Sequence, residues 1–175
     1  MRPSTRVSHA ALFLLLVGGV IWLGAVNIRA LISNDMLKTG TLEFEEYLAP
    51  EAEREIFRLI SFTSVVIMIS YTIVLVSGAV FLATSPLRLK EHGWLMMSAI
   101  LFSLFVPVEL YTMYLDARMV YMEFFTTAGN DVFRELFHAR LGVLAGAPLV
   151  ALLCYYTIIA LAVFRPFTKT PGGGK

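Results

Sequence analysis

The sequence predicts an all-α fold, a bundle of four transmembrane helices. Of its 175 residues, 58% are hydrophobic and only 15% are charged, whereas soluble domains are closer to half apolar and a quarter charged. The apolar residues gather in four blocks, each long enough to cross a bilayer as a helix. Because lipid offers the backbone no hydrogen-bond partner, each block must satisfy its own N–H and C=O groups, as a helix does.

The four predicted helices cover residues 10–31, 57–84, 93–115 and 131–164. The first apolar block is longer than the hydrophobic region of a signal peptide, and no small-residue cleavage site follows it, which favours a retained membrane helix. Pro50 and the glutamates after it suit the first turn of a helix, so we expect the second helix to begin near Pro50, outside the lipid. Pro166 ends the fourth helix.

The segments between these helices are polar. The first, residues 33–56, is a long acidic loop, and the third, residues 116–130, carries aromatic side chains (Tyr121, Phe124 and Phe125) that suit a position along the membrane surface. The glycine-rich tail, residues 168–175, is expected to be disordered. We therefore expect residues 1–175 to form a single integral membrane domain.

Basic residues predict the orientation. Seven lysines and arginines lie on the side of the two termini and seven on the other side, but the first set is concentrated in short segments near helix ends, where the positive-inside bias acts. We therefore predict a multi-pass protein of the cell (inner) membrane with cytoplasmic N- and C-termini. The net charge of +1 gives no indication of a nucleic-acid partner. The expected partner is the lipid bilayer, with other membrane subunits and self-association left open.

Glu109 is the least expected residue, because an ionised side chain inside an apolar helix costs at least about 2.5 kcal/mol unless it is paired, hydrated or protonated. Asn27, Arg29, His138 and Arg140 lie at helix ends on the side towards which Glu109 is placed. We predict that Glu109 pairs with Arg140, His138 or Arg29 in a polar pocket that opens outwards. The alternative is that these basic side chains reach lipid headgroups while Glu109 binds one neighbour and fixes helix packing.

Small residues and prolines indicate how the helices pack. Gly142 and Gly146 are four apart, so they share a helix face and favour close packing within the bundle over a dimer contact. Pro107 and Pro148 are predicted to kink two helices at a similar depth and to open a cleft. Close helix crossings are also expected at Gly18, Gly19, Gly24, Ser70, Ser77 and Gly78.

The histidines raise the question of haem. His9 and His92 lie at the cytoplasmic ends of two helices, where they could serve as axial ligands of a b-type haem. Neither lies inside an apolar run, which favours ordinary interfacial positions. No catalytic residues, metal ligands or resident cofactor are predicted, and Cys154 is the single cysteine, so no disulfide forms within the chain.

Three short motifs resemble a known family: Trp22-Leu23-Gly24, Trp94-Leu95 and Arg165-Pro166-Phe167. They resemble small four-helix membrane proteins of the copper-resistance CopD type, which include the HemJ family of protoporphyrinogen oxidases. The family's helix 1 histidine would fall on Leu15 and its helix 3 lysine on Ser98. The resemblance thus implies the four-helix fold, and it does not carry over the residues expected to handle porphyrin.

These observations predict a non-catalytic accessory, assembly or scaffolding component of a membrane complex. The helices show packing features, while no cofactor motif is complete. Two alternatives stay open: a membrane redox protein that handles haem, porphyrin or metal, and a small proton-coupled transporter that uses Glu109. An enzyme is the less favoured class.

Overall fold

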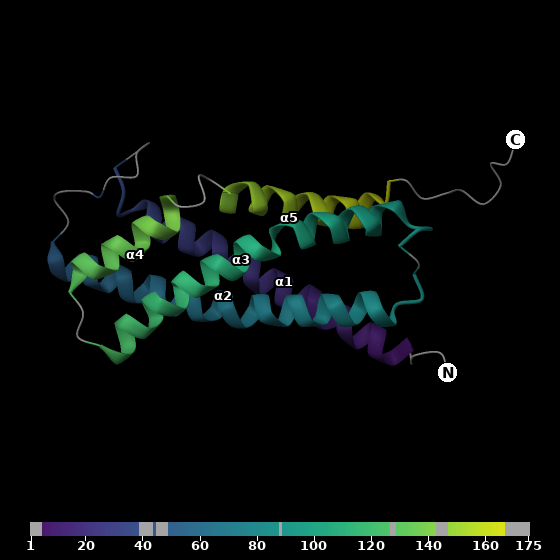
Figure 1. Cartoon of the computed structure of the whole chain (residues 1–175), viewed down its shortest axis with the longest axis horizontal. Coiled ribbons are helices and arrows are strands. Elements are labelled where there is room, and N and C mark those ends of the chain that lie inside the picture. Colours follow the sequence, from purple (N-terminus) through teal and green to yellow (C-terminus); the bar gives the residue numbers. More distant parts are fainter. Residues whose placement is uncertain are drawn as a thin grey trace, which may run out of the picture. The chain divides into compact units, whose positions relative to one another are not determined.

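The computed structural model describes residues 5–38, 44, 49–87, 89–126, 129–142 and 147–166. These residues form five helices and no strand (Figure 1), so the all-α prediction is confirmed. The helices are α1 (Thr5–Asn34), α2 (Pro50–Thr84), α3 (Gly93–Phe125), α4 (Asn130–Gly142) and α5 (Ala147–Phe164). Four of them, α1, α2, α3 and α5, are long and apolar enough to cross a membrane, which supports an integral membrane protein.

The second helix begins at Pro50, as the sequence predicted, but the third is longer than predicted. It continues to Phe125, so the segment expected to follow residue 115 as a loop is helical as far as that residue. Residues 116–125 contain no glycine or proline and several good helix formers, which explains the continuation. Asp116, the first residue of the segment predicted as a loop, lies inside α3 and is only 1% exposed.

The single helix predicted over residues 131–164 corresponds to two helices, α4 and α5, and residues 143–146 lie outside the described part. Pro148 is the second residue of α5, a position that suits proline, so it starts a helix instead of kinking one. Pro107 does lie inside α3. Gly142 ends α4, and a Cβ built on it would meet no described atom within 4 Å. Since Gly146 is not described, the paired-glycine face stays a prediction.

The chain divides into two compact units. Unit 1 comprises Met1–Thr84 and Thr112–Val143, and unit 2 comprises Ser85–Tyr111 and Leu144–Lys175. Unit 1 thus holds α1, α2, α4 and the C-terminal end of α3, while unit 2 holds the rest of α3 and α5.

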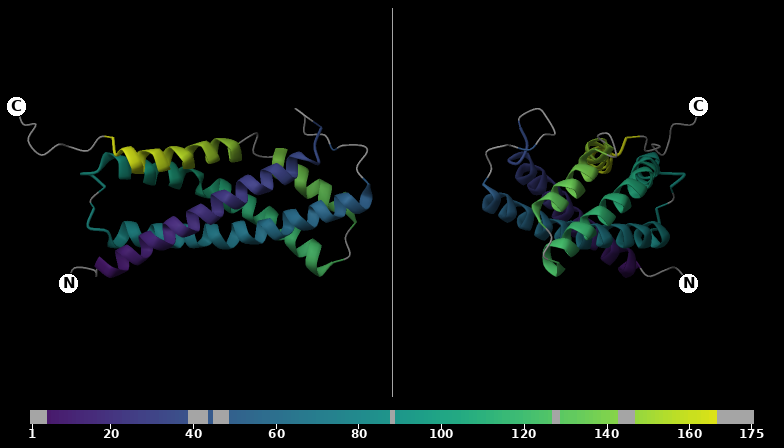
Figure 2. Two further views of the ribbon diagram at one scale, coloured as in Figure 1. Left: turned by 180° about the vertical axis from the view of Figure 1, so that it is seen from behind. Right: turned by 60° about the vertical axis from the view of Figure 1, so that its left-hand side comes forward.

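Within unit 1, α1 crosses α2 at close range (Figure 2). A Cβ built on Gly18 would stand 3.1 Å from Cγ2 of Ile73 and 3.3 Å from Cγ2 of Val74, so a side chain here would force its neighbours to shift. The α2 residues on this face include buried serines, and the hydroxyl of Ser70 donates to the carbonyl of Val66 one turn earlier. Small side chains that satisfy their own polar atoms therefore allow the approach.

The other small residues contribute less to this crossing. A Cβ on Gly78 would make an ordinary contact, 3.7 Å from Cδ1 of Leu15. A Cβ on Gly19 or Gly24 would meet no described atom within 4 Å. The close crossing expected from these glycines is thus found at Gly18.

At one end of unit 1, α1 and α3 end, α2 begins, and α4 runs beside the start of α2 (Figure 1). We call this end of unit 1 the head, and it has an apolar core of its own. The rings of Phe57 on α2 and Phe133 on α4 stack at 4.2 Å. The core residues are Met36, Phe57, Ile60, Met119, Phe133, Leu136 and Phe137. α2 and α3 have 35 and 33 residues, more than the about 20 that a bilayer requires, and α4, with 13 residues, is not a candidate span.

In unit 2, α5 lies along the first part of α3 (Figure 1). The ring of Tyr155 packs 6.1 Å from that of Phe102 and 6.4 Å from that of Phe105. At the end of α5, Arg165 adopts a positive φ of 44° and donates its N–H to the Leu161 carbonyl, a left-handed helix cap. Its guanidinium lies 5.7 Å from the centroid of Trp94, which joins the two helices at this end.

Candidate functional site

Asp116 on α3 is the most buried charged residue of the described chain, and two arginines meet at its carboxylate. Arg29 on α1 donates from Nη1 to Oδ2 of this carboxylate at 2.5 Å, and Arg140 on α4 donates from Nε to Oδ1 at 2.7 Å. The exposed fractions of the three side chains are 1% for Asp116, 7% for Arg29 and 12% for Arg140. Both carboxylate oxygens are therefore engaged by guanidinium groups away from water.

A fourth helix joins the same cluster, which we call the Asp116 cluster. Nη1 of Arg29 also donates to Oγ of Ser64 on α2, at 3.2 Å. Hydrogen bonds between ionised groups are roughly twice as strong as neutral ones. Removing one partner from a buried ion pair leaves a desolvated charge and is strongly destabilising. The cluster is thus a tie between α1, α2, α3 and α4 whose members depend on one another.

The sequence placed Arg29 and Arg140 near one another, and the structure brings them together on Asp116. Glu109, the carboxylate that the sequence offered as their partner, lies in unit 2. Its pairing with these arginines or with His138 stays a prediction.

The two other residues of the predicted pocket lie in unit 1 with different neighbours. Asn27 donates from Nδ2 to the Leu23 carbonyl of its own helix at 2.7 Å. The imidazole of His138 is exposed, and Phe44 meets it edge-on at 4.8 Å between ring centroids. His138 thus contributes a packing contact at the surface of the head.

A second ion pair ties α2 to α4. Arg134 donates from Nε to Oε1 of Glu53 at 2.5 Å and from Nη2 to Oε2 at 2.9 Å, and Nδ2 of Asn130 donates to the same Oε2 at 3.0 Å. The hydrogen bond to Glu53 raises the pKa of Arg134 above its ordinary value. Glu53 belongs to the segment predicted as a solvated acidic loop, but its side chain is 3% exposed. A two-pronged guanidinium bond explains how this carboxylate tolerates burial.

A third ion pair ties α2 to α3. Nη2 of Arg54 lies 3.1 Å from Oε2 of Glu123, whose side chain is 7% exposed. Both residues belong to the head. Buried carboxylates from three different positions are therefore matched with arginines of neighbouring helices.

In unit 2, Glu109 on α3 has a hydroxyl neighbour. Oη of Tyr155 donates to Oε1 of Glu109 at 3.4 Å, a long hydrogen bond, and Tyr155 is 4% exposed. Phe102 and Phe105 pack against the same tyrosine. The hydroxyl of Tyr155 thus joins α5 to α3 within unit 2.

The two histidines of the haem hypothesis lie in different units. His9 is exposed on α1, in unit 1. His92, in unit 2, precedes α3, and its carbonyl accepts the N–H groups of Leu95 and Met96, which caps the helix start. Haem ligation by this pair stays a prediction. Within the described residues, no group of three or more histidine, cysteine, aspartate or glutamate side chains could hold a metal ion.

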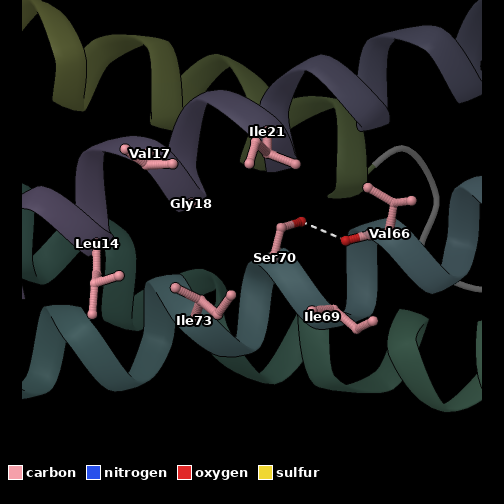
Figure 3. Close-up of a pocket in the computed structure, with 8 residues that line it drawn as sticks. All are labelled: Leu14, Val17, Gly18, Ile21, Val66, Ile69, Ser70 and Ile73. Carbon is pink, nitrogen blue, oxygen red and sulfur yellow. Dashed lines mark hydrogen bonds between the residues drawn. The ribbon is translucent and has the colours of Figure 1, made fainter.

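An apolar groove lies between α1 and α2 (Figure 3), with a volume of about 260 Å³. Its polar side chain, Ser70, donates its hydroxyl to the Val66 carbonyl of the same helix. The groove therefore offers hydrocarbon contact without a polar group directed at a ligand. Its lining residues are Leu14, Val17, Gly18, Ile21, Val66, Ile69, Ser70 and Ile73.

Sequence reasoning missed Asp116, Glu53, Glu123 and Ser64 as members of the ion-paired network. A usable signal existed for Asp116. Thr112, Leu115, Asp116 and Met119 are spaced like the inner face of a helix, and all four are buried. No such signal pairs Glu53 with Arg134, because the two are 81 residues apart.

Comparisons with known proteins identify no relative. No protein-family model matches the chain, and no curated protein or solved structure shows significant similarity to it.

Proposed function

We propose that this chain is a non-catalytic component of a membrane complex, in which the head serves as a rigid assembly surface. In the proposed orientation the two termini are on the cytoplasmic side of the cell (inner) membrane, and the head is on the opposite side. The observation that carries the proposal is the Asp116 cluster, where Arg29 and Arg140 are both bound to one buried carboxylate. The most costly charges of unit 1 are thus used to hold helices together.

The other ion pairs support the same role. Glu53 with Arg134 joins α2 to α4, and Arg54 with Glu123 joins α2 to α3. With the apolar core, these contacts fix the relative positions of four helix ends. A surface fixed in this way loses little conformational entropy when a partner binds, which favours assembly.

The apolar spans also offer surface to neighbours. Only 11% of the most apolar window is buried in α3, and the same fraction in α5. The rest of each window is not buried and offers apolar surface to lipid or to neighbouring helices. We therefore include subunit contacts within the membrane in the proposal.

The test is purification of the tagged full chain from its native membrane in a mild detergent, followed by mass spectrometry. We expect other membrane subunits to co-purify in fixed ratio with the wild type and the Glu55→Gln control, and to be lost with Asp116→Asn. Glu55 is a suitable control because its side chain is 69% exposed. A wild-type chain that is folded and repeatedly purifies alone would contradict the proposal.

A second candidate function is proton-coupled transport, favoured by the hydrogen bond between Tyr155 and Glu109 in unit 2. In reconstituted vesicles, this function requires a pH-driven flux that Glu109→Gln abolishes and Tyr155→Phe reduces. Equal flux in wild-type and Glu109→Gln vesicles would end this candidate.

A further inference from the structure

The head carries a group of exposed aromatic side chains on the part of α3 that the sequence had not predicted to be helical. Tyr121, Phe124 and Phe125 are 60%, 40% and 73% exposed. The rings of Tyr121 and Phe125, one turn apart, stack at 5.7 Å. Phe124 meets Phe62 of α2, which is 50% exposed, edge-on at 4.9 Å. We call these four residues the aromatic ledge; all of them belong to unit 1.

Two arginines accompany the ledge. The guanidinium of Arg58 lies 5.8 Å from the centroid of Phe62, and its side chain is 54% exposed. Arg118, also exposed, lies on α3 one turn before Tyr121. Arginines whose stems lie along apolar surface and whose charges reach outwards are suited to binding phosphate groups of lipids.

The ledge lies where the exposed face of α2 changes character. Between Phe62 and Ser85 this face exposes mainly aliphatic side chains, and the exposed Thr72 at its edge donates its hydroxyl to the Met68 carbonyl of the same helix. Towards the start, it carries Arg58, Glu55 and Glu51, all exposed. The aliphatic positions, from the ledge onwards, are Val66, Ile69, Ile73, Val76 and Val80.

The length of α2 agrees with a bilayer boundary at this point. From Phe62 to Thr84 the helix rises roughly 33 Å at 1.5 Å per residue. The hydrocarbon core of a bilayer is about 30 Å thick. With Thr84 near one surface of the membrane, Phe62 therefore lies near the other, where aromatic residues concentrate in membrane proteins.

We propose that the aromatic ledge is an anchor that inserts into the headgroup region of the leaflet next to the head, with Arg58 and Arg118 binding lipid phosphates. Its continuity with the aliphatic face of α2 and its two flanking arginines favour a lipid surface over a protein partner. The anchor places Ser64, two residues further along α2 than Phe62, at the edge of the hydrocarbon. The Asp116 cluster would then be held at the membrane boundary, sealed from lipid by the helices around it.

The test measures depth in the membrane. In a full-length Cys154→Ser background, single cysteines are introduced by Tyr121→Cys, Phe125→Cys, Glu55→Cys and Val76→Cys, and each is spin-labelled. The protein is reconstituted into vesicles of phosphatidylcholine and phosphatidylglycerol. Collision rates with oxygen, which partitions into lipid, and with a water-soluble nickel complex then report the depth of each label.

We expect the oxygen-to-nickel ratio at positions 121 and 125 to be severalfold higher than at position 55 and severalfold lower than at position 76. Two independent ledge positions guard against one label that disturbs folding. Ratios at 121 and 125 equal to that at 55 would place the ledge in water and overturn the proposal. Labels at both ledge positions that neither reagent reaches would show that a second copy of the chain covers the ledge, which would also overturn it.

Discussion

Arg29 and Asp116 are 87 residues apart in the sequence, yet their side chains form a 2.5 Å ion pair in which neither residue is more than 7% exposed. Arg140 occupies the second carboxylate oxygen. Because both arginines depend on one carboxylate, the loss of that charge leaves two desolvated cations facing each other. The Asp116 cluster is therefore the point at which unit 1 is most sensitive to a single substitution.

We expect Asp116→Asn to lower the free energy of unfolding by about 3–5 kcal/mol, the usual cost of breaking a buried ion pair by removing one partner. Denaturant titration in detergent micelles measures this change. Glu55→Gln is the matched control, since Glu55 forms an exposed pair with Arg58 at 4.0 Å. Such pairs contribute about 0.5 kcal/mol or less. Equal stability of the two variants would contradict the structural role of Asp116.

The crossing of α1 and α2 gives a second prediction, from two adjacent glycines. A Cβ at Gly18 would stand 3.1 Å from Ile73, whereas one at Gly19 would meet no described atom within 4 Å. We expect Gly18→Ala to destabilise the chain by about 1 kcal/mol, the lower end of the cost of overpacking. Gly19→Ala should leave stability unchanged or raise it slightly, because alanine is the better helix former. Unfolding midpoints measured side by side test this, and the reverse order would refute the close crossing.

The pair of Glu53 and Arg134 predicts a pH dependence. Its hydrogen bond raises the pKa of Arg134, so the protonated guanidinium contributes stability that is fully present below the ordinary pKa of arginine and is lost only as the pH rises through the raised value. We therefore expect the Arg134 charge to make a constant contribution to the free energy of unfolding from neutral pH to about pH 10.

Arg134→Lys provides the comparison. Lysine cannot form both bonds to Glu53, so we expect a loss of about 1 kcal/mol or less at pH 7. Its ordinary pKa is about 10.4, so the loss should grow as the pH approaches that value. Unfolding titrations at several pH values between neutral and alkaline measure the difference, and parallel pH profiles for wild type and variant would contradict this assignment.

Tyr155 separates a hydrogen bond from ring packing in unit 2. Tyr155→Phe removes the hydroxyl bonded to Glu109 but keeps the ring against Phe102 and Phe105. Side-chain hydrogen bonds between membrane helices average about 0.6 kcal/mol, so we expect a loss of that size. Tyr155→Ala, which also removes the ring, should cost about 3–5 kcal/mol. Unfolding free energies of the two variants test this. A loss for Tyr155→Phe as large as that for Tyr155→Ala would show that the hydroxyl, and not the ring, provides the stabilisation.

The fold was predictable because the apolar blocks are long and the lipid environment permits few alternatives. The start of α2 at Pro50 was predictable for a local reason, since proline and glutamates suit a first turn. Pro148 shows the limit of such reasoning. The same residue type kinks a helix or starts one, and its role depends on where α4 ends, which the apolar pattern alone does not mark.

The candidate site was less predictable, because a charged residue at the end of an apolar block can lie in water at the membrane surface or be buried in an ion pair between helices. The apolar pattern of the third predicted helix ends just before Asp116 and indicates a polar loop there, whereas the residue lies inside α3 and is 1% exposed. Its burial depends on arginines from two other helices, and no local pattern reveals partners that far apart in sequence. Arg29 and Arg140 could be placed on one side of the membrane, but the carboxylate that they share could not be identified.

The most direct test of the central claim, that the Asp116 cluster is a structural tie, replaces all three charges at once with Arg29→Met, Asp116→Leu and Arg140→Met. Buried ion pairs can often be exchanged for apolar residues of similar size without loss of stability. We expect the triple variant to unfold at a denaturant concentration close to that of the wild type and to co-purify with the same membrane subunits. A triple variant that folds with native stability but no longer assembles would show that the charges themselves perform the function, and would contradict the claim.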